Sequence, residues 1–379
     1  MSDRPFLSVI VPAYNGIRVL PQSLAALAAS DLPREHWELI VVDDASTDET
    51  AALAARWADA VVRLPGLPHG PAYGRNRGVE AALGDVLVFV DADVCVHADT
   101  LRRFAELFSV ERDLAAAFGS YDAQPPVPGL VSQYRNLLHH YHHQRNPGDA
   151  ETFWSGCGAV RRAAFLAAGK FDEWHYNRPS VEDIDLGHRL RGQGGRIALR
   201  PEIQCSHLKR WQLYSMIRTD LLDRGIPWMR LLLHEGRIGS MQALNLRTQE
   251  KVNTALVGVA LLCALLAVPF GLPWLAAAGV LLVPVLVTNA DLYRFFIAQR
   301  GYRFALAVIP LNIIYYLLCG CSAAFGWLLH HWVGELSPAA EIQAFREVGV
   351  SRWPPVPVQS PWGGRGIARL GGRAPGDAP

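Results

Sequence analysis

Two aspartates separated by one residue, Asp91 and Asp93, directly follow the apolar segment 86–90. Carboxylates that converge on one point repel each other unless a cation lies between them. Mg²⁺ and Mn²⁺ are commonly held by one or two carboxylates together with substrate phosphates. The pair therefore predicts a divalent metal site that also receives a phosphate group. From spacing alone, a turn capped by two aspartates remains the alternative.

The elements that must position these aspartates alternate between strand and helix. Short apolar runs predict buried strands at residues 7–11, 38–42, 60–64 and 86–90, and helical spacing predicts helices at 18–30, 51–58 and 71–83. This alternation is typical of an α/β fold with a parallel sheet. Ligands of such sheets bind beyond the carboxyl ends of the strands. Asn15, Asp44 and the Asp91–Asp93 pair are all expected there.

Composition and missing motifs exclude several classes of protein. With 36 Lys and Arg against 35 Asp and Glu, the net charge is +1, which argues against a nucleic-acid binder. Half of the chain is hydrophobic and 19% is charged, so a disordered chain is also excluded. No G-x-G-x-x-G follows the first predicted strand, and no P-loop motif occurs. A dinucleotide oxidoreductase and a P-loop nucleotidase are therefore not expected.

Two long segments, 252–290 and 304–334, contain no Asp, Glu, Lys or Arg. A membrane-spanning helix needs about 20 apolar residues, so we expect about three spans, at 252–270, 273–289 and 304–329. Basic residues flank the spans, and no signal sequence is evident at the start, which predicts a multi-pass protein of the cell membrane whose catalytic domain faces the cytoplasm. The predicted organisation is a catalytic domain at 1–235, a juxtamembrane segment at 236–251, a transmembrane region at 252–330, and a partly disordered tail at 331–379.

Seven motifs in a fixed order resemble the family 2 glycosyltransferases. They are residues 8–15, 41–50, 74–78, 90–93, 154–158, 171–173 and 181–186. The resemblance covers residues 6–230 and implies a GT-A fold, a Rossmann-like mixed sheet. It also implies an inverting transfer of a sugar from a nucleotide-diphosphate donor, such as a UDP- or GDP-sugar.

The resemblance implies roles for individual residues on the donor side. Nucleotide binding would involve Pro12, Tyr14, Asn15, Asp44, Arg75, Arg77 and Asp91. Within that set, Asp44 would bind the base, and the two arginines would contact the nucleotide or its phosphates. Asp91, Asp93 and His207 would hold Mg²⁺ or Mn²⁺, which would stabilise the leaving nucleotide.

On the acceptor side, the resemblance implies that Asp183 is the general base, with Glu182 beside it. A helix N-terminus would lower the basicity of Asp183, whereas Glu182 and an apolar acceptor site would raise it. Capping of the helix alone is the alternative. Acceptor binding is predicted for Trp154, Gly156, Arg224 and Trp228. The histidines in residues 139–143 could bind zinc, but a solvated or membrane-surface helix is the preferred interpretation.

The predicted function is thus sugar transfer to a hydroxyl or phosphate acceptor, with a lipid-linked acceptor expected because the site lies close to the spans. Processive family members carry Q-x-x-R-W before their membrane channel, whereas residues 207–211 here begin with His207. This difference favours a single transfer. The helix predicted at 212–233 carries arginines suited to an anionic bilayer. The alternatives are a processive polysaccharide synthase or export subunit, or a non-catalytic nucleotide-sugar-binding membrane protein.

Overall fold

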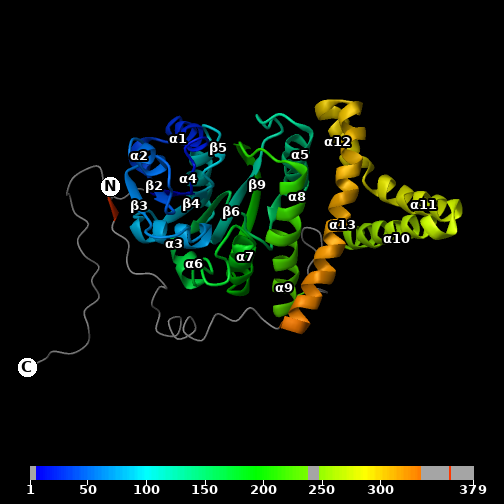
Figure 1. The fold of residues 1–379 in the computed structure, drawn as a ribbon. Helices are drawn as coiled ribbons and strands as arrows, with labels where there is room; N and C mark the ends of the chain where they lie inside the picture. Colours follow the sequence, from blue (N-terminus) through cyan, green and yellow to red (C-terminus); the bar gives the residue numbers. More distant parts are fainter. Residues whose placement is uncertain (1–5, 238–246, 334–357, 360–379) are drawn as a thin grey trace, which may run out of the picture.

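The computed structural model describes residues 6–237, 247–333 and 358–359. Its centre is a mixed sheet in the order β10-β3-β2-β1-β4-β8-β6-β9-β5, with β7 paired to β9 (Figure 1). Four neighbouring strands run parallel, namely β3 (Ala60–Arg63), β2 (Trp37–Asp43), β1 (Leu7–Ala13) and β4 (Val86–Val90). They confirm the four strands predicted from apolar runs. The predicted tail at 331–379 lies almost entirely outside the described residues.

The other half of the sheet is mixed. β8 (Cys157–Arg161) runs antiparallel between β4 and β6 (Leu114–Tyr121). β9 (Arg196–His207) is parallel to β6 and antiparallel to β5 (Val94–Val96) and to β7 (Gly148–Asp149). β10 (Val358–Gln359) is antiparallel to β3. Because β5 pairs with β9, with Val94 opposite His207, the aspartate pair between β4 and β5 lies beside the end of β9.

Helices cover both faces of the sheet. On one face lie α1 (Leu20–Ala28), α2 (Thr50–Ala54) and α4 (Thr100–Val110), and on the other α3 (Pro71–Ala81), α6 (Arg162–Ala167) and α7 (Glu182–Gly192). Along β1, Val9 and Val11 belong to the first core and Ile10 to the second. A strand buried on both faces must be apolar throughout, which explains the continuous apolar runs. A short 3₁₀ helix, η1 (Arg34–His36), precedes β2.

A third layer lies beyond β9. α5 (Leu130–Gln144) packs against a continuous helical run made of α8 (Leu213–Arg218), the π-helix η2 (Thr219–Gly225) and α9 (Ile226–His234). This run confirms the helix predicted at 212–233. Buried side chains join the layer to the C-terminal helices through a cluster that includes Tyr134, Phe296 and Val308. The third layer and the C-terminal helices therefore share a buried cluster, which is separate from the two cores of the sheet.

Four helices make up the predicted membrane region: α10 (Thr248–Phe270), α11 (Leu272–Thr288), α12 (Ala290–Arg300) and α13 (Tyr302–Val333). By length and composition α10 and α13 could each cross a membrane, as could α11 with α12 if this pair, bent by 67°, is counted as one span. Gly271, at φ +87°, breaks the first apolar segment where the sequence predicts a break. The helix α12 lies between the second and third predicted spans.

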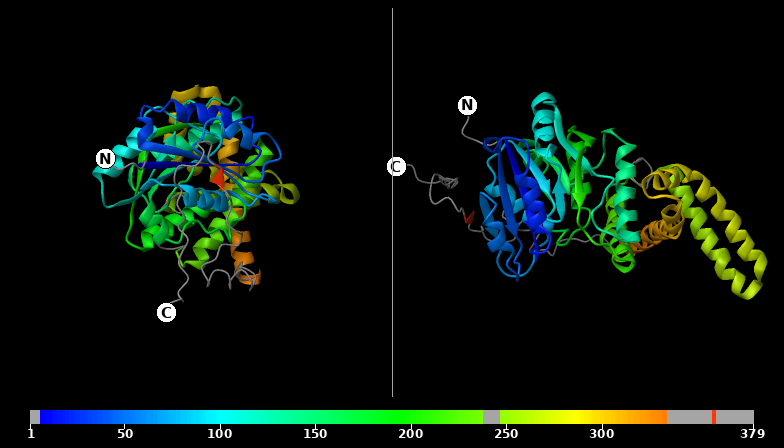
Figure 2. Two further views of the ribbon diagram at one scale, coloured as in Figure 1. Left: turned by 90° about the vertical axis from the view of Figure 1, so that its left-hand side faces the viewer. Right: turned by 90° about the horizontal axis from the view of Figure 1, so that it is seen from above.

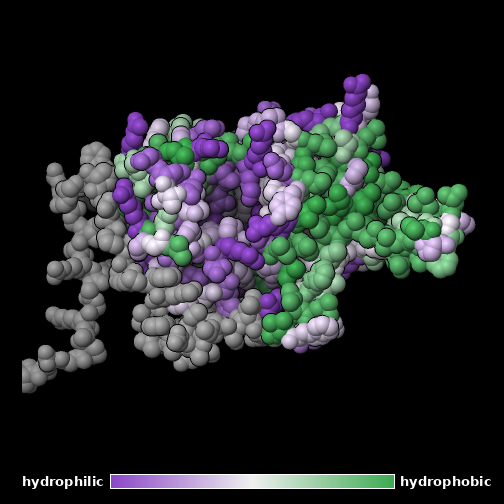
Figure 3. All heavy atoms as spheres, in the orientation of Figure 1, coloured by the Kyte–Doolittle hydropathy of each residue, from purple (hydrophilic) through white to green (hydrophobic). Residues whose placement is uncertain are grey.

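The apolar helices differ in how they contact the rest of the molecule. The α10–α11 hairpin projects away from the sheet, whereas α13 lies along η2 and α9 (Figures 1 and 2). Hydrophobic side chains gather over this end of the molecule (Figure 3), among them the exposed Leu262, Leu265 and Val283. The close contact of α13 depends on Gly225, where an added Cβ would lie 2.0 Å from Ser322 Oγ.

Candidate active site

The aspartate pair lies in the tight turn between β4 and β5. The Val94 N–H donates to the Asp91 carbonyl (3.0 Å) and closes this turn. β9 holds the turn from the other side, because the Leu208 N–H donates to the Asp93 carbonyl (2.8 Å). As a result Asp93 Oδ2 lies 3.5 Å from His207 Nε2. The structure thus brings together two predicted metal ligands that are far apart in the sequence.

Asp93 is held in its ionised form. Burial opposes ionisation, but the hydrogen bond from His207 and the charges of His207 and Lys209 hold the pKa of Asp93 below its usual value. The carboxylate and the imidazole form a donor set that Mg²⁺ or Mn²⁺ accepts. Within residues 6–237 and 247–333, no three His, Cys, Asp or Glu side chains are grouped so as to hold a metal by themselves. The residues present therefore fit a cation whose remaining ligands come from a bound phosphate.

Arg75 on α3 connects the aspartate pair to the second acidic pair. Its Nη2 donates to Asp91 Oδ1 (2.7 Å) and its Nη1 to Glu182 Oε1 (2.9 Å). The side chain is only 4% exposed, and its guanidinium carbon lies 5.4 Å from the centre of the Phe171 ring. Both terminal nitrogens contact carboxylates, so Arg75 bridges the turn after β4 and the first turn of α7. Its contact with the nucleotide or its phosphates stays a prediction. A buried arginine with two carboxylate partners holds both in fixed positions.

Arg77, two residues further along α3, does not join this cluster. Its guanidinium pairs with Glu173 (3.2 Å) and Glu80 (3.1 Å) and lies over the Tyr73 ring. These contacts attach α3 to the segment that precedes α7. Two carboxylates and an aromatic ring thus surround Arg77, and its contact with the nucleotide or its phosphates stays a prediction.

Asp183 lies in the first turn of α7, beside Glu182. The backbone N–H and the hydroxyl of Ser155 donate to its Oδ2 (3.1 and 3.3 Å). Burial and the charge of Glu182 raise the pKa of Asp183 to about 6, against the opposing effects of the Ser155 N–H, Arg75 and Arg224. Glu182 itself is bound by Arg75 and by the Ser180 N–H (2.8 Å). Asp183 is therefore a carboxylate poised to take up a proton near neutral pH.

The loops after β1 and β2 contact each other at the same edge of the sheet. Asn15, at φ +48°, accepts the Thr47 N–H at its Oδ1 (2.8 Å) and donates its own N–H to Ser46 Oγ (2.9 Å). Pro12 is half-buried on β1, whereas Tyr14 is 51% exposed beside it. The residues predicted to bind the nucleoside thus lie on two loops that are hydrogen-bonded to each other.

The Asp44 carboxylate accepts hydrogen bonds within the protein that the sequence does not predict. It accepts the backbone N–H groups of His69 (2.9 Å) and Gly70 (2.8 Å) and also lies 2.9 Å from His69 Nδ1. These bonds hold the segment that leads into α3. The His69 N–H also lies 3.0 Å from Oδ2, so both carboxylate oxygens accept hydrogen bonds within the protein, and binding of the base by Asp44 stays a prediction.

The position of the Trp154 ring depends on the absence of a side chain at Gly156. An added Cβ on Gly156 would lie 2.6 Å from the Trp154 ring, so this glycine leaves space for the indole. The indole packs against Tyr121 (4.9 Å) and His139 (4.7 Å). The predicted role of Gly156, a close approach to the acceptor, is thus indirect, because the neighbouring indole already fills the space.

The histidines of α5 are part of the fold. His140 Nδ1 lies 2.7 Å from the Tyr121 carbonyl and His143 Nδ1 lies 3.0 Å from the Gly119 carbonyl, both on β6. The His139 ring packs at tilted angles against Tyr121, His143 and Trp154. The preferred interpretation of a solvated helix is therefore wrong for His139, His140 and His143, because β6 and the aromatic rings cover them.

Two of the predicted acceptor residues lie on the run α8–η2–α9 and differ in exposure. Arg224 is exposed on the π-helix, and its charge reaches Asp183 and Lys209. Trp228 is only 6% exposed and packs with Val181 and Leu232. The expectation that the Trp228 ring is free to stack on an acceptor is corrected, because the indole forms part of the core that supports α7.

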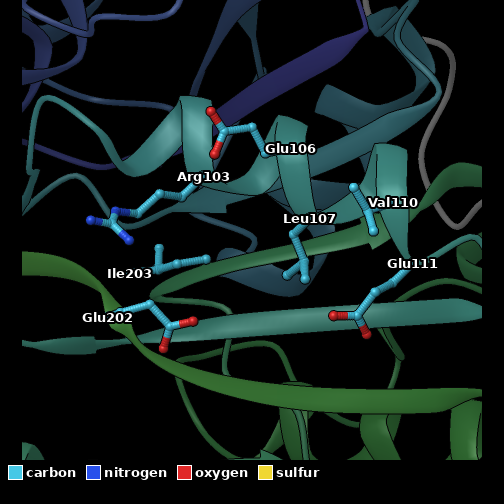
Figure 4. A pocket seen from close by; sticks show the side chains of 7 residues that line it. All are labelled: Arg103, Glu106, Leu107, Val110, Glu111, Glu202 and Ile203. Carbon is cyan, nitrogen blue, oxygen red and sulfur yellow. The ribbon is translucent and has the colours of Figure 1, made fainter.

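An open hollow of about 280 Å³ lies elsewhere on the surface, between α4 and β9 (Figure 4). Its lining includes Arg103, Glu106 and Ile203 and none of the predicted site residues. The hollow is therefore separate from the carboxylate cluster.

Several residues that shape the cluster have no role in the predicted set. They include Ser155 at Asp183, and Tyr121 and Asn136 at His207. Ser155 lies inside the motif at 154–158 and could have been found from it. Tyr121 and Asn136 have no such signal, since only the pairing of β6 with β9 and the packing of α5 bring them to the site.

Comparisons with known proteins agree with this architecture. The sequence model of the family described as "Glycosyl transferase family 2" matches residues 8–168. Poly(ribitol-phosphate) beta-N-acetylglucosaminyltransferase TarS from Staphylococcus aureus is 35% identical over 25% of this chain, but the match spans only 17% of the length of TarS. Validoxylamine A glucosyltransferase from Streptomyces hygroscopicus is 27% identical over 67% of this chain and 70% of its own length.

Among solved structures, the mannosyltransferase PcManGT from Pyrobaculum calidifontis, in complex with GDP-Man and Mn²⁺, has the same fold. The TM-score is 0.56 over 88% of both chains, at 23% sequence identity. The strand order, the carboxylate cluster after β4 and the family match point to the same conclusion. The chain carries a family 2 glycosyltransferase domain on a GT-A fold.

Proposed function

We propose that this protein transfers a sugar from a nucleotide-diphosphate sugar to an acceptor hydroxyl, with inversion at the anomeric carbon. One observation carries the proposal: Asp183, with its raised pKa, is joined through Glu182 and Arg75 to the turn that holds Asp91 and Asp93. A base and a phosphate-binding carboxylate pair are thereby fixed relative to each other. Such fixed positioning is the main requirement for a direct displacement.

In this reaction Asp183 accepts the proton of the acceptor hydroxyl. The acceptor oxygen forms a bond to the anomeric carbon while the bond from that carbon to the diphosphate oxygen breaks. The nucleoside diphosphate leaves as an anion and carries away the electron pair. Asp93 and His207, with Asp91, would hold Mg²⁺ or Mn²⁺, which would neutralise charge on the leaving diphosphate. The hydrogen-bonded loops around Asn15 and Asp44 would bind the nucleoside.

The donor class is supported by the relatives. TarS is named for the transfer of N-acetylglucosamine, and PcManGT is described with GDP-Man and Mn²⁺. Neither observation selects UDP over GDP for this chain.

We infer that the acceptor is lipid-linked and that the enzyme works at the cell membrane, with its catalytic domain in the cytoplasm and a role in the cell envelope. Arg224 lies near the base, and the helical run that carries it packs on α13, one of the two helices long and apolar enough to cross a membrane. A processive polysaccharide synthase is the second candidate, favoured only by the Arg210-Trp211 pair before the membrane region.

Product analysis tests the proposal. Full-length protein in detergent is incubated with UDP- and GDP-sugars and extracted lipids, with and without Mn²⁺. We expect one sugar per acceptor and free nucleoside diphosphate in equal amount. Asp183→Asn should retain nucleotide binding, measured by titration calorimetry, and lose turnover. Nucleotide binding without turnover in the wild-type protein would instead indicate a binding module, and long products would indicate a processive synthase.

A further inference from the structure

Asn136 on α5 contacts the candidate metal ligand His207 from behind. The asparagine is 1% exposed, and both ends of its amide have partners. Its Nδ2 donates to the Ser132 carbonyl one helical turn earlier (3.1 Å), and its Oδ1 lies 3.0 Å from His207 Nδ1. An amide oxygen only accepts hydrogen bonds. Since the amide nitrogen is turned toward a carbonyl, the hydrogen between Asn136 and His207 must be on Nδ1.

This arrangement decides which nitrogen of His207 is available. A neutral imidazole with its hydrogen on Nδ1 has its free electron pair on Nε2. Nε2 is the atom that lies 3.5 Å from Asp93 Oδ2. In this neutral form two electron-pair donors face each other across a gap, which either a proton on Nε2 or a divalent cation bridges. An outer partner on one nitrogen commonly fixes the other nitrogen of a ligating histidine in this way.

The ring of His207 is also fixed in its plane. It stacks on Tyr121 with the ring centres 4.6 Å apart and the planes inclined by 8°. Stacking prevents the imidazole from tipping, but it still permits the ring to turn by 180° about χ2. The hydrogen bond to Asn136 removes that freedom, because a flipped ring would place a carbon against the amide oxygen.

α5 is attached to the same segment at a second point. Ser132 Oγ accepts the Trp211 N–H (2.8 Å), so residues one helical turn apart hold both ends of the segment from His207 to Trp211. The segment therefore has a fixed backbone as well as a fixed imidazole. A buried asparagine whose only role was a hydrogen bond within its own helix would need the bond to Ser132 but no partner on β9.

We propose that Asn136 is a positioning residue, which fixes the tautomer and orientation of His207 so that Nε2 binds a divalent cation together with Asp93 and the diphosphate of the donor. The inference rests on the proposed transferase function and adds a residue to which neither the sequence motifs nor the comparisons point. It applies to the complex of cation and nucleotide, because the described side chains alone do not enclose a metal.

The test measures Mn²⁺ binding directly. Free Mn²⁺ is counted by electron paramagnetic resonance in titrations of the full-length protein in detergent, with UDP or GDP present. Asn136→Leu keeps the number of side-chain heavy atoms and the branching at Cγ but has no acceptor, and we expect it to weaken Mn²⁺ binding about 10- to 100-fold. Binding of the nucleotide without metal should be unchanged. Asn136→Asp, which keeps an acceptor oxygen toward Nδ1, should bind Mn²⁺ within a few-fold of wild type.

Two further variants give the matched controls. Gln133→Leu removes an amide from the same helix, where Gln133 Nε2 donates to Pro125 and Val127 carbonyls away from His207, and it should bind Mn²⁺ like wild type. The double variant Asn136→Leu/His207→Gln should lose no more affinity than His207→Gln alone, because Asn136 acts only through this histidine.

Several results would overturn the inference. One is wild-type Mn²⁺ affinity in a folded Asn136→Leu protein, and another is an additive loss in the double variant. If Asn136→Leu does not fold, failure of Asn136→Asp to bind Mn²⁺ serves as the refuting result. Wild-type protein that transfers sugar without binding Mn²⁺ would refute the role of Asn136 while leaving the proposed function intact. Absence of both transfer and binding would refute both.

Discussion

Replacing the proposed base, Asp183→Asn, should abolish transfer and stabilise the protein at the same time. Burial and the adjacent charge of Glu182 raise the pKa of Asp183 from 3.8 to about 6. In the folded protein this carboxyl therefore holds its proton over a pH range where the unfolded chain has lost it. Stability accordingly falls as the pH rises from about 4 to about 6, and the full penalty is present above that range.

The size of the penalty follows from the shift in pKa. At about 1.4 kcal/mol for each pKa unit, raising the value from 3.8 to about 6 costs the fold about 3 kcal/mol at neutral pH. An asparagine of the same shape carries no charge and should recover part of that free energy. Thermal unfolding in detergent at pH 7.5 and pH 5 measures the effect. The variant should unfold at a higher temperature than wild type at pH 7.5, and the difference should shrink at pH 5.

The pH dependence of activity should report the same ionisation of Asp183. Only the ionised carboxylate can accept a proton, so kcat/KM of the wild type should fall about tenfold for each pH unit below about 6. Asp183→Asn should reduce kcat by about 10²- to 10⁴-fold. Asp185→Asn is the matched control, because Asp185 lies on the same helix and pairs with Arg189 (2.8 Å). A flat pH profile between pH 5 and pH 7, or wild-type turnover in Asp183→Asn, would refute the assignment of the base.

Three other substitutions test the structure around the site. Arg75→Met leaves two carboxylates without their buried partner and should lower the free energy of unfolding by about 3–5 kcal/mol. The loss of kcat should exceed the loss of nucleotide affinity, and equal losses would contradict the bridging role of Arg75. Gly156→Ala places a Cβ 2.6 Å from the Trp154 ring and should lower the free energy of unfolding by about 1–3 kcal/mol, measured by thermal unfolding. Gly192→Ala is the control, because the space around Gly192 is open, and it should lower that free energy by less than about 1 kcal/mol. Trp228→Ala should destabilise the fold by about 3–5 kcal/mol, and a change in acceptor KM without destabilisation would restore the discarded stacking role.

Many features of this protein follow from local sequence alone. The four parallel strands were predictable because strands buried on both faces must be apolar throughout, and the turn residues after them are polar. The break at Gly271 was predictable because its positive φ favours glycine. The Asp91–Asp93 pair was recognisable as a candidate site because it directly follows a predicted strand, whereas the Glu182–Asp183 pair was assigned through the resemblance to family 2 glycosyltransferases.

Only the tertiary structure decided how the side chains at these positions pair. Arg75 and Arg77 occupy the same helix, two residues apart, yet the former bridges two acidic loops and the latter pairs with Glu173. Trp228 was expected on the surface but is covered by Val181 and Leu232, because the packing of α7 against α9 is a long-range contact. Asn136 reaches His207 only through the placement of α5 over β9. Periodicity fixes which face of an element is apolar, but the partner of a buried charge or amide depends on residues that are remote in the chain.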